Sequence, residues 1–570
     1  MRDKNEFLHI LNEIDRRNGL EYEQLTGDFD FSRYILKFGR PQLNGLQAPF
    51  MLAVLRVPQS IAGFPPDLFN TAIRRTGLED LLTRKLSHFI EQLAHFGEQG
   101  LARRQLHAVK PGQKILPRSS VQVTEDYVEA RVGVELPSNR GLVQAAAARD
   151  LFFEDLPEVV NHALVFCNLD EKEVNEFVDS MEDADAIRQS LPTRGWVGFV
   201  AEGSCPSRKP GSDDPDYYQS LPVSASGGLL SEIQVPRAGS VKGIGIPAGV
   251  TLVLGDAFSG RTEVMRALAS GIYNHVPGDG REAIVTVPDA VYIKADPGRS
   301  IHRVNLGAFL DGRPDFGDIR QYSHESADSF SSQAASIAEM LEAGARVLLL
   351  DESDSVAEFL SVDSRVANLP SEAPGGVYPL SEHVNQLANE LGVSLVIAGN
   401  AAVAGLIPAA DTILKIEHFK ISDITQQAKA LVRENEKTPA RKDRPLEESS
   451  RWVVPSSLDP MKGTHSVFVK ASGTHRLDFG RVTVDLSSLV QLAEVNQTAT
   501  IGQILCYLKE RYMDQPRPIR EILDLIDRDL STEGLEVLTR DLRGDLARPR
   551  RYEIAMALNR LPSLRIAAGS

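Results

Sequence analysis

Cysteine is scarce in this chain, and its few copies are far apart. The sequence has three, Cys167, Cys205 and Cys506, among 570 residues, and no two of them form a C-x-x-C pair. A disulfide framework or a cysteine-based zinc site needs cysteines at suitable spacing, so the pattern argues against both. The scarcity favours a reducing compartment, and we expect a cytoplasmic protein.

Long apolar runs are also missing. The longest uncharged stretch, Ser394 to Ala410, contains Asn400 and Pro408 and is shorter than the roughly 20 apolar residues of a membrane-spanning helix. The first residues, MRDKNEFLHILNEIDRRNG, are charged and patterned as a helix, without the apolar core of a signal peptide. We therefore expect no membrane association.

The chain has fewer basic than acidic residues. It contains 62 Lys and Arg against 78 Asp and Glu, so the net charge is −16. This balance argues against sequence-blind coating of nucleic acid, although a local basic groove could still bind it. One stretch, Ala102 to Ser120, is basic and contains no acid. Its candidate contacts with RNA or another polyanion are Arg103, Arg104, Lys110, Lys114 and Arg118. No aromatic residues interleave for base stacking, so a solvated loop is the competing interpretation.

Changes in composition and in hydrophobic pattern divide the chain into four parts. Residues 1–236 mix helix-like and strand-like stretches, which predicts an α+β domain. Residues 237–434 repeat strand, loop and helix, which favours an α/β fold with a parallel sheet flanked by helices. Residues 435–460 are charged and proline-containing, as in a linker, and residues 461–570 are mostly amphipathic helix.

The most informative stretch is VTLVLGDAFSGRT. An apolar run, Val250 to Leu254, precedes a glycine-bounded loop and a helix-like segment. Such a loop can wrap phosphates with backbone N–H groups while the helix points its positive end at the ligand. Arg261 stands where the pattern G-x-x-x-x-G-K-[ST] has lysine, and Thr262 follows as an expected Mg²⁺ ligand. Arginine supplies charge, but its planar fork need not reach the same phosphate oxygens. An ordinary glycine turn is the alternative.

A second motif follows downstream in RVLLLDES. The apolar run Val347 to Leu350 leads to Asp351 and Glu352, as in a buried strand that ends in an Mg²⁺-supporting aspartate and a carboxylate able to polarise water. The alternative is that Asp351 merely ends a strand. Between the two motifs, SADSFSSQAASIAEMLEAGA places a serine-rich turn before a helix, which is the order found in ABC-type ATPases. Asn400 ends a further apolar run, SLVIAGN.

Several longer stretches carry a specific resemblance. They are GIYNHVPGDGRE (Gly271 to Glu282), SSQAASIAEMLEAGARVLLLDE (Ser331 to Glu352), DFGRVTVDLSSLVQL (Asp478 to Leu492) and LARPRRYEIAMALNRL (Leu546 to Leu561). With them, the chain resembles the predicted "ATPase of the ABC class" family. The resemblance implies an ABC-class P-loop NTPase core with an α+β N-terminal domain and a mostly helical C-terminal domain. It also implies binding of ATP or ADP with Mg²⁺ and a homodimer that closes on ATP.

The resemblance assigns roles to individual residues. It makes Glu352 and Asp351 catalytic, and Thr262 and Asp351 the Mg²⁺ ligands. The expected nucleotide contacts are Gly255, Asp256, Ala257, Phe258, Ser259, Gly260, Arg261, Thr262 and Glu263, with Ser329 and Gln333 from the serine-rich turn.

Departures from the family pattern fall at this site. The family loop ends in G-K-S-T, whereas this one ends Gly260, Arg261, Thr262, Glu263. Ser329 stands where the family turn has a glycine that lets backbone approach a phosphate. The interpretation that follows is a nucleotide-dependent switch with slow or degenerate ATP hydrolysis. A non-catalytic scaffold with a vestigial site and an active ATPase working on RNA or ribonucleoprotein are the alternatives.

Overall fold

The computed structural model describes residues 1–41, 49–95, 105–218, 220–226, 228–312, 317–362, 376–433, 444–447, 449–463 and 466–567. The chain forms two compact units. The first comprises residues 1–182 together with 533–548, and the second comprises residues 183–532 together with 549–570. Each unit has its own sheets and its own buried core.

The first unit is built on a mixed sheet with the strand order β1-β2-β3-β4-β8-β5, and β7 also pairs with β8. Its strands are β1 (Arg2–Asp3), β2 (Gly27–Asp30), β3 (Ile35–Phe38), β4 (Phe50–Pro58), β5 (Leu106–His107), β7 (Val121–Val123) and β8 (Tyr127–Glu135). Only the β1–β2 pairing among these is parallel. The stretch VEARVGVE, residues 128–135, lies in β8, which pairs with β4 along its whole length.

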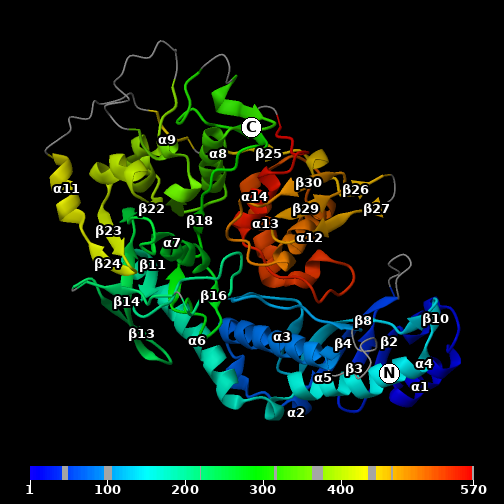
Figure 1. The fold of residues 1–570 in the computed structure, drawn as a ribbon. Coiled ribbons are helices and arrows are strands. Elements are labelled where there is room, and N and C mark those ends of the chain that lie inside the picture. The colour runs from blue at the N-terminus through cyan, green and yellow to red at the C-terminus, as the bar shows by residue number, and fades with distance from the viewer. Residues whose placement is uncertain are drawn as a thin grey trace. The chain divides into compact units, whose positions relative to one another are not determined.

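Helices complete the first unit. They are α1 (Lys4–Glu13), α2 (Gln59–Ala62), α3 (Ala72–His95), α4 (Ala145–Asp150), α5 (Leu156–Ala163) and the first part of α6 (Glu171–Ser190). The stretch DLLTRKLSHFIEQLAH, residues 80–95, lies in α3, which packs against α5 and β7 (Figure 1). The α+β character predicted for the N-terminal region is confirmed.

A segment from near the C-terminus belongs to this first unit. Arg131 donates from Nη1 to Glu536 at 2.7 Å, and the backbone N–H of Ser119 donates to the Leu546 carbonyl at 3.1 Å. Residues 533–548 therefore pack with the N-terminal region, although the sequence predicts that they belong to the C-terminal domain.

The second unit is built on a mostly parallel sheet with the order β12-β24-β23-β15-β22-β21-β18. Its strands are β12 (Ser224–Ala225), β15 (Val250–Leu254), β18 (Ala290–Tyr292), β21 (Val347–Asp351), β22 (Ser394–Gly399), β23 (Thr412–Glu417) and β24 (Lys420–Asp423). Of these, β18, β21, β22, β15 and β23 run parallel, so their carboxyl ends share one edge. Near-continuous burial along them matches a sheet covered on both faces. The α/β fold class is confirmed.

A second sheet spans the predicted boundary at residue 236. Strand β11 (Trp196–Ala201) pairs with β14 (Gly239–Pro247) and with β17 (Ile284–Thr286), and β13 (Ser231–Val235) lies beside β14. These pairings join residues on both sides of 236, and the first compact unit ends its N-terminal part at residue 182.

The C-terminal part of the second unit is mostly helical, as predicted. Helices α12 (Val495–Arg511), α13 (Ile519–Thr532) and α14 (Arg551–Asn559) lie together beside a small sheet of β28 (Val469–Ala471), β29 (Arg476–Phe479) and β30 (Val482–Asp485) (Figure 1). It is not a separate compact unit. Gln491 donates from Nε2 to the Ala269 carbonyl at 2.9 Å, and Arg560 donates from Nε to Asp296 Oδ2 at 2.9 Å.

The predicted linker, residues 435–460, is described only in part, since residues 434–443 and 448 lie outside the described ranges. Within the described part, Arg451 is buried and its guanidinium donates to Glu342 at 2.7 Å. At this residue the segment is packed into the fold rather than exposed.

Candidate nucleotide site

The loop Gly255 to Gly260 connects β15 to α7 (Arg261–Ser270) at the carboxyl edge of the parallel sheet. Gly260 precedes the helix in a left-handed conformation, φ +92°, and no side chain caps the helix there. A Cβ on Gly260 would lie 2.7 Å from the ring of Phe419, so glycine is required by both conformation and space. The uncapped first turn of α7 offers its N–H groups and positive dipole end to an anion.

Phe419 is a part of this site that the sequence did not reveal. It lies in the turn between β23 and β24 with φ +61°, and its N–H donates to the Ser259 carbonyl at 2.9 Å. A Cβ on Gly255 would lie 2.5 Å from Ser259 Oγ, so the loop is also compact at its start. Sequence patterns could not have found Phe419, because it belongs to a remote turn without a motif.

The tip of the loop is open to solvent. Phe258 is 99% exposed in a left-handed conformation, φ +64°, and Ala257 beside it is exposed. Asp256 is exposed as well, and its Oδ1 accepts a hydrogen bond from Asn400 Nδ2 at 2.9 Å. The loop is therefore linked to the end of β22, where Asn400 lies.

Arg261 turns its guanidinium toward the acids at the strand ends. Its Nη1 donates to the Gly255 carbonyl at 2.9 Å, and its Nη2 lies 3.6 Å from Asp351 Oδ1. The same Nη1 is 4.0 Å from Glu352 Oε2. Among the residues that the structure describes, its buried Nε has no hydrogen-bond partner. The charge of Arg261 is thus divided among the acids and the loop's own backbone, with one donor unused.

Asp351 and Glu352 are held differently. Asp351 is fully buried, and its Oδ1 accepts from the N–H and the hydroxyl of Ser353 at 2.9 and 2.8 Å. Its Oδ2 is buried without a partner in the described part of the chain. Glu352 is partly exposed, and its Oε2 accepts from the backbone N–H of Asn400 at 2.5 Å. Glu352 therefore lies fixed at the mouth of the site, where a carboxylate could polarise water.

Asp354 ties the loop helix to the turn that follows Glu352. It forms an ion pair with Arg266 of α7, and it accepts from the Tyr292 hydroxyl at 2.7 Å. Lys294 Nζ lies 3.1 Å from its other oxygen. Burial opposes the charged form, but the hydrogen bond from Tyr292 and the charges of Arg266 and Lys294 hold the pKa of Asp354 below its ordinary value. A shift of α7 would therefore be felt at the Asp351–Glu352 turn.

The serine-rich turn is less open than the sequence predicts. Ser329 begins α8 (Ser329–Glu342) and is half-buried, and Phe330 packs edge-on against Phe359. Gln333 is fully buried, where it donates to Ser355 Oγ at 2.8 Å and accepts from the N–H of Val356 at 3.1 Å. In this conformation Gln333 holds the segment after Glu352 in place through both its amide nitrogen and its amide oxygen, so the amide is not free for a ligand.

The remaining predicted contacts lie at the start of α7. Thr262 is half-buried and Glu263 is exposed, both in the first turn of the helix. The loop and this uncapped turn fit the phosphates of a nucleotide. The unpartnered Asp351 Oδ2 and the Thr262 hydroxyl are oxygen donors that suit Mg²⁺, which would supply charge neutralisation of the phosphates when bound.

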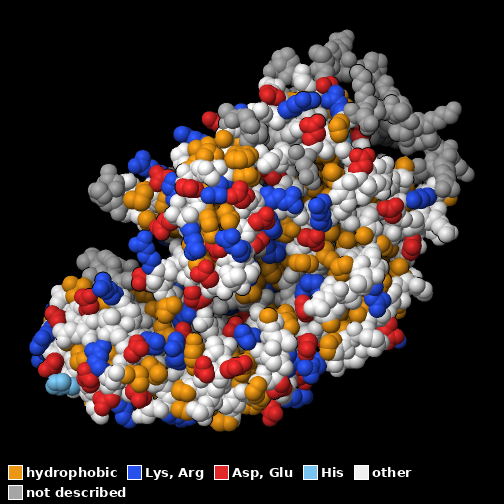
Figure 2. Space-filling view, turned by 180° about the vertical axis from the view of Figure 1, so that it is seen from behind, with side chains coloured by type: hydrophobic (Ala, Val, Ile, Leu, Met, Phe, Trp, Pro, Cys, Tyr) orange, Lys and Arg blue, Asp and Glu red, His pale blue; other side chains and the backbone are white. Residues whose placement is uncertain are grey.

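The predicted polyanion patch is wrong in one of its members. Arg118 is buried, with its side chain 1% exposed, and its Nε donates to Asp80 at 2.8 Å. Lys110 is paired with Glu91 at 2.9 Å, and Arg103 and Arg104 lie outside the described residues. On the face drawn in Figure 2, basic and acidic side chains are intermixed rather than segregated.

Three family models match the chain and together span most of it. The ATPase of the ABC class N-terminal model matches residues 4–167, and the ABC ATPase P-loop domain model matches residues 170–451. The chain belongs to the ATPase of the ABC class family. A third model, the MRB1590 C-terminal domain, matches residues 468–567. Membership supports nucleotide binding by the P-loop, and the boundary between the first two models agrees with a first unit shorter than 236 residues.

Individual relatives are more remote. An uncharacterized protein of Methanocaldococcus jannaschii is 25% identical over 251 residues, covering 41% of this chain and 53% of the relative, about half of its length. Two solved structures are 12% identical with TM-scores of 0.26: cbiO1 of Clostridium perfringens, part of the ABC transporter complex cbiONQ, and an ATP-binding cassette of an ABC transporter in its ADP conformation. They cover 42% of this chain and 94% and 96% of their own chains. In the described residues of the present chain, no helix is both long and apolar enough to cross a membrane.

Proposed function

We propose that this chain binds ATP or ADP with Mg²⁺ at the loop Gly255 to Thr262 and uses the nucleotide as a conformational switch, with slow or absent hydrolysis. One observation carries the proposal. The guanidinium of Arg261 is engaged by the Gly255 carbonyl and faces both Asp351 and Glu352. A phosphate must draw this side chain away from its present partners.

Slow turnover follows from that geometry. Phosphoryl transfer depends on charges placed against the γ-phosphate, and catalysis falls when they are misplaced by about 1 Å. Arg261 shares its charge with two carboxylates, at 3.6 Å from Asp351 and 4.0 Å from Glu352, and its planar guanidinium need not reach the phosphate oxygens that a lysine would. Nucleotide binding is retained because the backbone of α7 supplies donors independently of this side chain.

In the proposed switch, Asp354 and Asn400 connect the nucleotide loop and its helix to the two acids. Asp354 joins α7 to the Asp351–Glu352 turn, and Asn400 joins Asp256 in the loop to Glu352. Nucleotide on the loop would therefore move the two acids together with α7. Two copies closing on ATP would place Ser329 of one copy near the nucleotide of the other.

Differential thermal unfolding tests the proposal. A ligand at a hundred times its dissociation constant stabilises the native state by about 2.7 kcal/mol, so Mg-ATP and Mg-ADP should raise the Tm. Arg261→Glu should remove most of the shift, whereas Arg481→Glu, a charge reversal at an exposed residue between β29 and β30, should leave it intact. A wild-type Tm unaffected by either nucleotide would favour a scaffold with a vestigial site.

Sedimentation separates the switch from simple binding. Glu352→Gln blocks turnover and should accumulate the ATP-bound form as a dimer, whereas Mg-ADP should leave it monomeric. A protein that stays monomeric under both conditions would contradict ATP-driven closure while leaving nucleotide binding in place.

A further inference from the structure

The order of the strands decides which side of the loop is left for the nucleoside of a bound nucleotide. Strand β15, which leads into the loop, lies between β22 and β23, and β21 lies beyond β22. Asp351 ends β21 and Glu352 follows it, so the groups suited to Mg²⁺ and to the attacking water lie on the β22 side. The terminal phosphate must point toward these groups. The nucleoside, at the other end of the phosphate chain, then extends over β23.

The turn between β23 and β24 is fixed beside the loop. Lys415 of β23 pairs in register with Leu254, the residue directly before the loop. The N–H of Phe419 donates to the Ser259 carbonyl at 2.9 Å, and its ring fills the space where a Cβ on Gly260 would lie. Side chains exposed on this turn are therefore next to a ligand held by the loop.

His418 is the exposed aromatic side chain of this turn, and it directly precedes the buried Phe419. Both residues have a left-handed backbone, φ +50° and +61°, which non-glycine residues seldom adopt. The contacts of Phe419 with the loop hold the turn in this conformation. A flat ring on a fixed backbone suits a nucleic-acid base, because bases stack on aromatic side chains, histidine included.

Lys415, the cation of this hairpin beside the loop, already has an acidic partner. Its Nζ lies 2.6 Å from Glu417. The hydrogen bond and the charge of Glu417 raise the pKa of Lys415, and the charge of Asp256 in the loop adds to the effect. Asp256 is itself bonded to Asn400 on the β22 side. The imidazole of His418 is therefore the group of this turn that suits an uncharged base.

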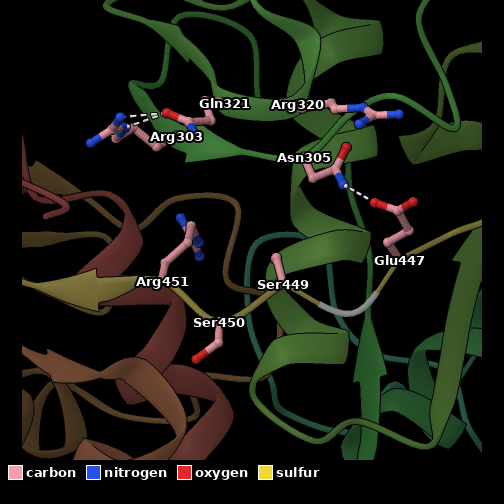
Figure 3. Close-up of a pocket in the computed structure, with 8 residues that line it drawn as sticks. All are labelled: Arg303, Asn305, Arg320, Gln321, Glu447, Ser449, Ser450 and Arg451. Atoms are coloured by element: carbon pink, nitrogen blue, oxygen red, sulfur yellow. Dashed lines mark hydrogen bonds between the residues drawn. The ribbon is translucent and has the colours of Figure 1, made fainter. Parts of the chain in front are cut away.

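The polar pocket drawn in Figure 3, of about 270 Å³, is a separate feature of the second unit. It shares no residue with the loop or with the β23–β24 turn. Its Arg303 and Arg320 point away from each other, and Arg303 donates to the amide oxygen of Gln321 (Figure 3). These two arginines do not converge on one phosphate.

We infer that the nucleoside of the bound nucleotide lies over the β23–β24 turn and that its base stacks on the imidazole of His418. This inference rests on the proposed nucleotide function, because the loop must first hold the phosphates. The two ends of the ligand then depend on different residues. Arg261 and the loop bind the phosphates, whereas His418 adds the part of the affinity that requires a base.

Isothermal titration of the full chain with Mg-ATP and with Mg-tripolyphosphate, which has no nucleoside, separates the two contributions. His418→Ala should raise the Kd for ATP at least about fivefold and leave the Kd for tripolyphosphate unchanged, because it removes only the stacking surface. His418→Phe keeps an aromatic face and should restore ATP affinity. Arg261→Glu should weaken both ligands. His475→Ala removes another exposed histidine of the second unit, before β29, and should bind both ligands as wild type does.

The outcomes distinguish this inference from the proposed function on which it rests. A wild-type chain that binds neither ligand would contradict the nucleotide site and this inference together. ATP binding that His418→Ala leaves unchanged, or weakens no more than tripolyphosphate binding, would overturn this inference alone. A selective loss of ATP affinity in Phe258→Ala but not in His418→Ala would overturn it as well, because the base would then lie at the tip of the loop.

Discussion

Arg261 and Asp351 face each other across the candidate site, with Nη2 of the guanidinium 3.6 Å from Oδ1 of the carboxylate. Arg261 is 14% exposed and Asp351 is fully buried, so water screens their attraction only weakly. The contact holds the loop's cation beside the acid that would bind Mg²⁺. A nucleotide whose phosphates drew Arg261 onto themselves would therefore break this contact.

Replacing the arginine should reveal how much activity it suppresses. We expect Arg261→Lys to raise ATP turnover about tenfold, equivalent to ~1.4 kcal/mol of barrier, because a lysine reaches a phosphate as a point charge. Adding Glu263→Thr should raise turnover further by removing a negative charge beside the loop. Phosphate release measures the rate, and Glu352→Gln should abolish the gain. A lysine variant slower than wild type would show that the arginine is an adapted catalytic group.

Gly260 should be intolerant of any side chain. Gly260→Ala forces a left-handed alanine, which costs ~1–2 kcal/mol, and it drives Cβ into Phe419, which adds ~1–3 kcal/mol of overpacking. Gly298 has nearly the same conformation, φ +90°, with open space around its Cβ position, so Gly298→Ala should show the strain alone. Urea unfolding measures both losses. Equal losses of stability in the two variants would mean that the Phe419 ring moves away from the added Cβ. If Gly260→Ala loses more, adding Phe419→Ala should remove the difference.

The hydrogen bond between Asn400 and Asp256 should contribute to nucleotide affinity. Asn400→Asp keeps the backbone N–H that binds Glu352 but places a carboxylate against Asp256 Oδ1. Because both side chains are exposed, we expect a loss of up to ~1 kcal/mol, roughly fivefold in Kd, that shrinks at high salt. Nucleotide titration measures it. The double variant with Asp256→Asn restores a hydrogen-bonded pair and should recover affinity; no recovery would contradict the link.

The free energy of unfolding should fall as pH rises, because Glu79 becomes ionised in the folded protein. Burial is the main cause that raises the pKa of Glu79 to about 7, despite the hydrogen bond from the Val123 N–H. Since the folded pKa lies above the unfolded value, the favourable contribution is complete below pH ~4.5 and is lost as pH rises through ~7. Glu79→Gln keeps an acceptor for Val123 and should stabilise the protein at pH 8 by up to ~3 kcal/mol, with little effect at pH 5. The exposed Glu125→Gln is the matched control, and equal pH profiles for both would contradict this account.

Much of the nucleotide site was predictable because its parts are contiguous in the chain. Val250–Leu254, the loop and α7 follow one another, and strand β21 runs directly into Asp351 and Glu352. Apolar runs, glycine positions and strand-end acids are local signals, so the sequence alone determined the P-loop, the two acids and the α/β class of the core.

Only the tertiary structure decided which remote groups complete the site. Phe419 over Gly260, Asn400 between Asp256 and Glu352, and the turn of Arg261 toward Asp351 all depend on the order of strands in the sheet. The placement of residues 533–548 with the first unit likewise arises from contacts with Arg131 and Ser119, far away in the chain. Hydrophobic periodicity shows which face of a segment is buried but not which segment covers it, and that choice is made by packing and hydrogen-bond satisfaction across the whole chain.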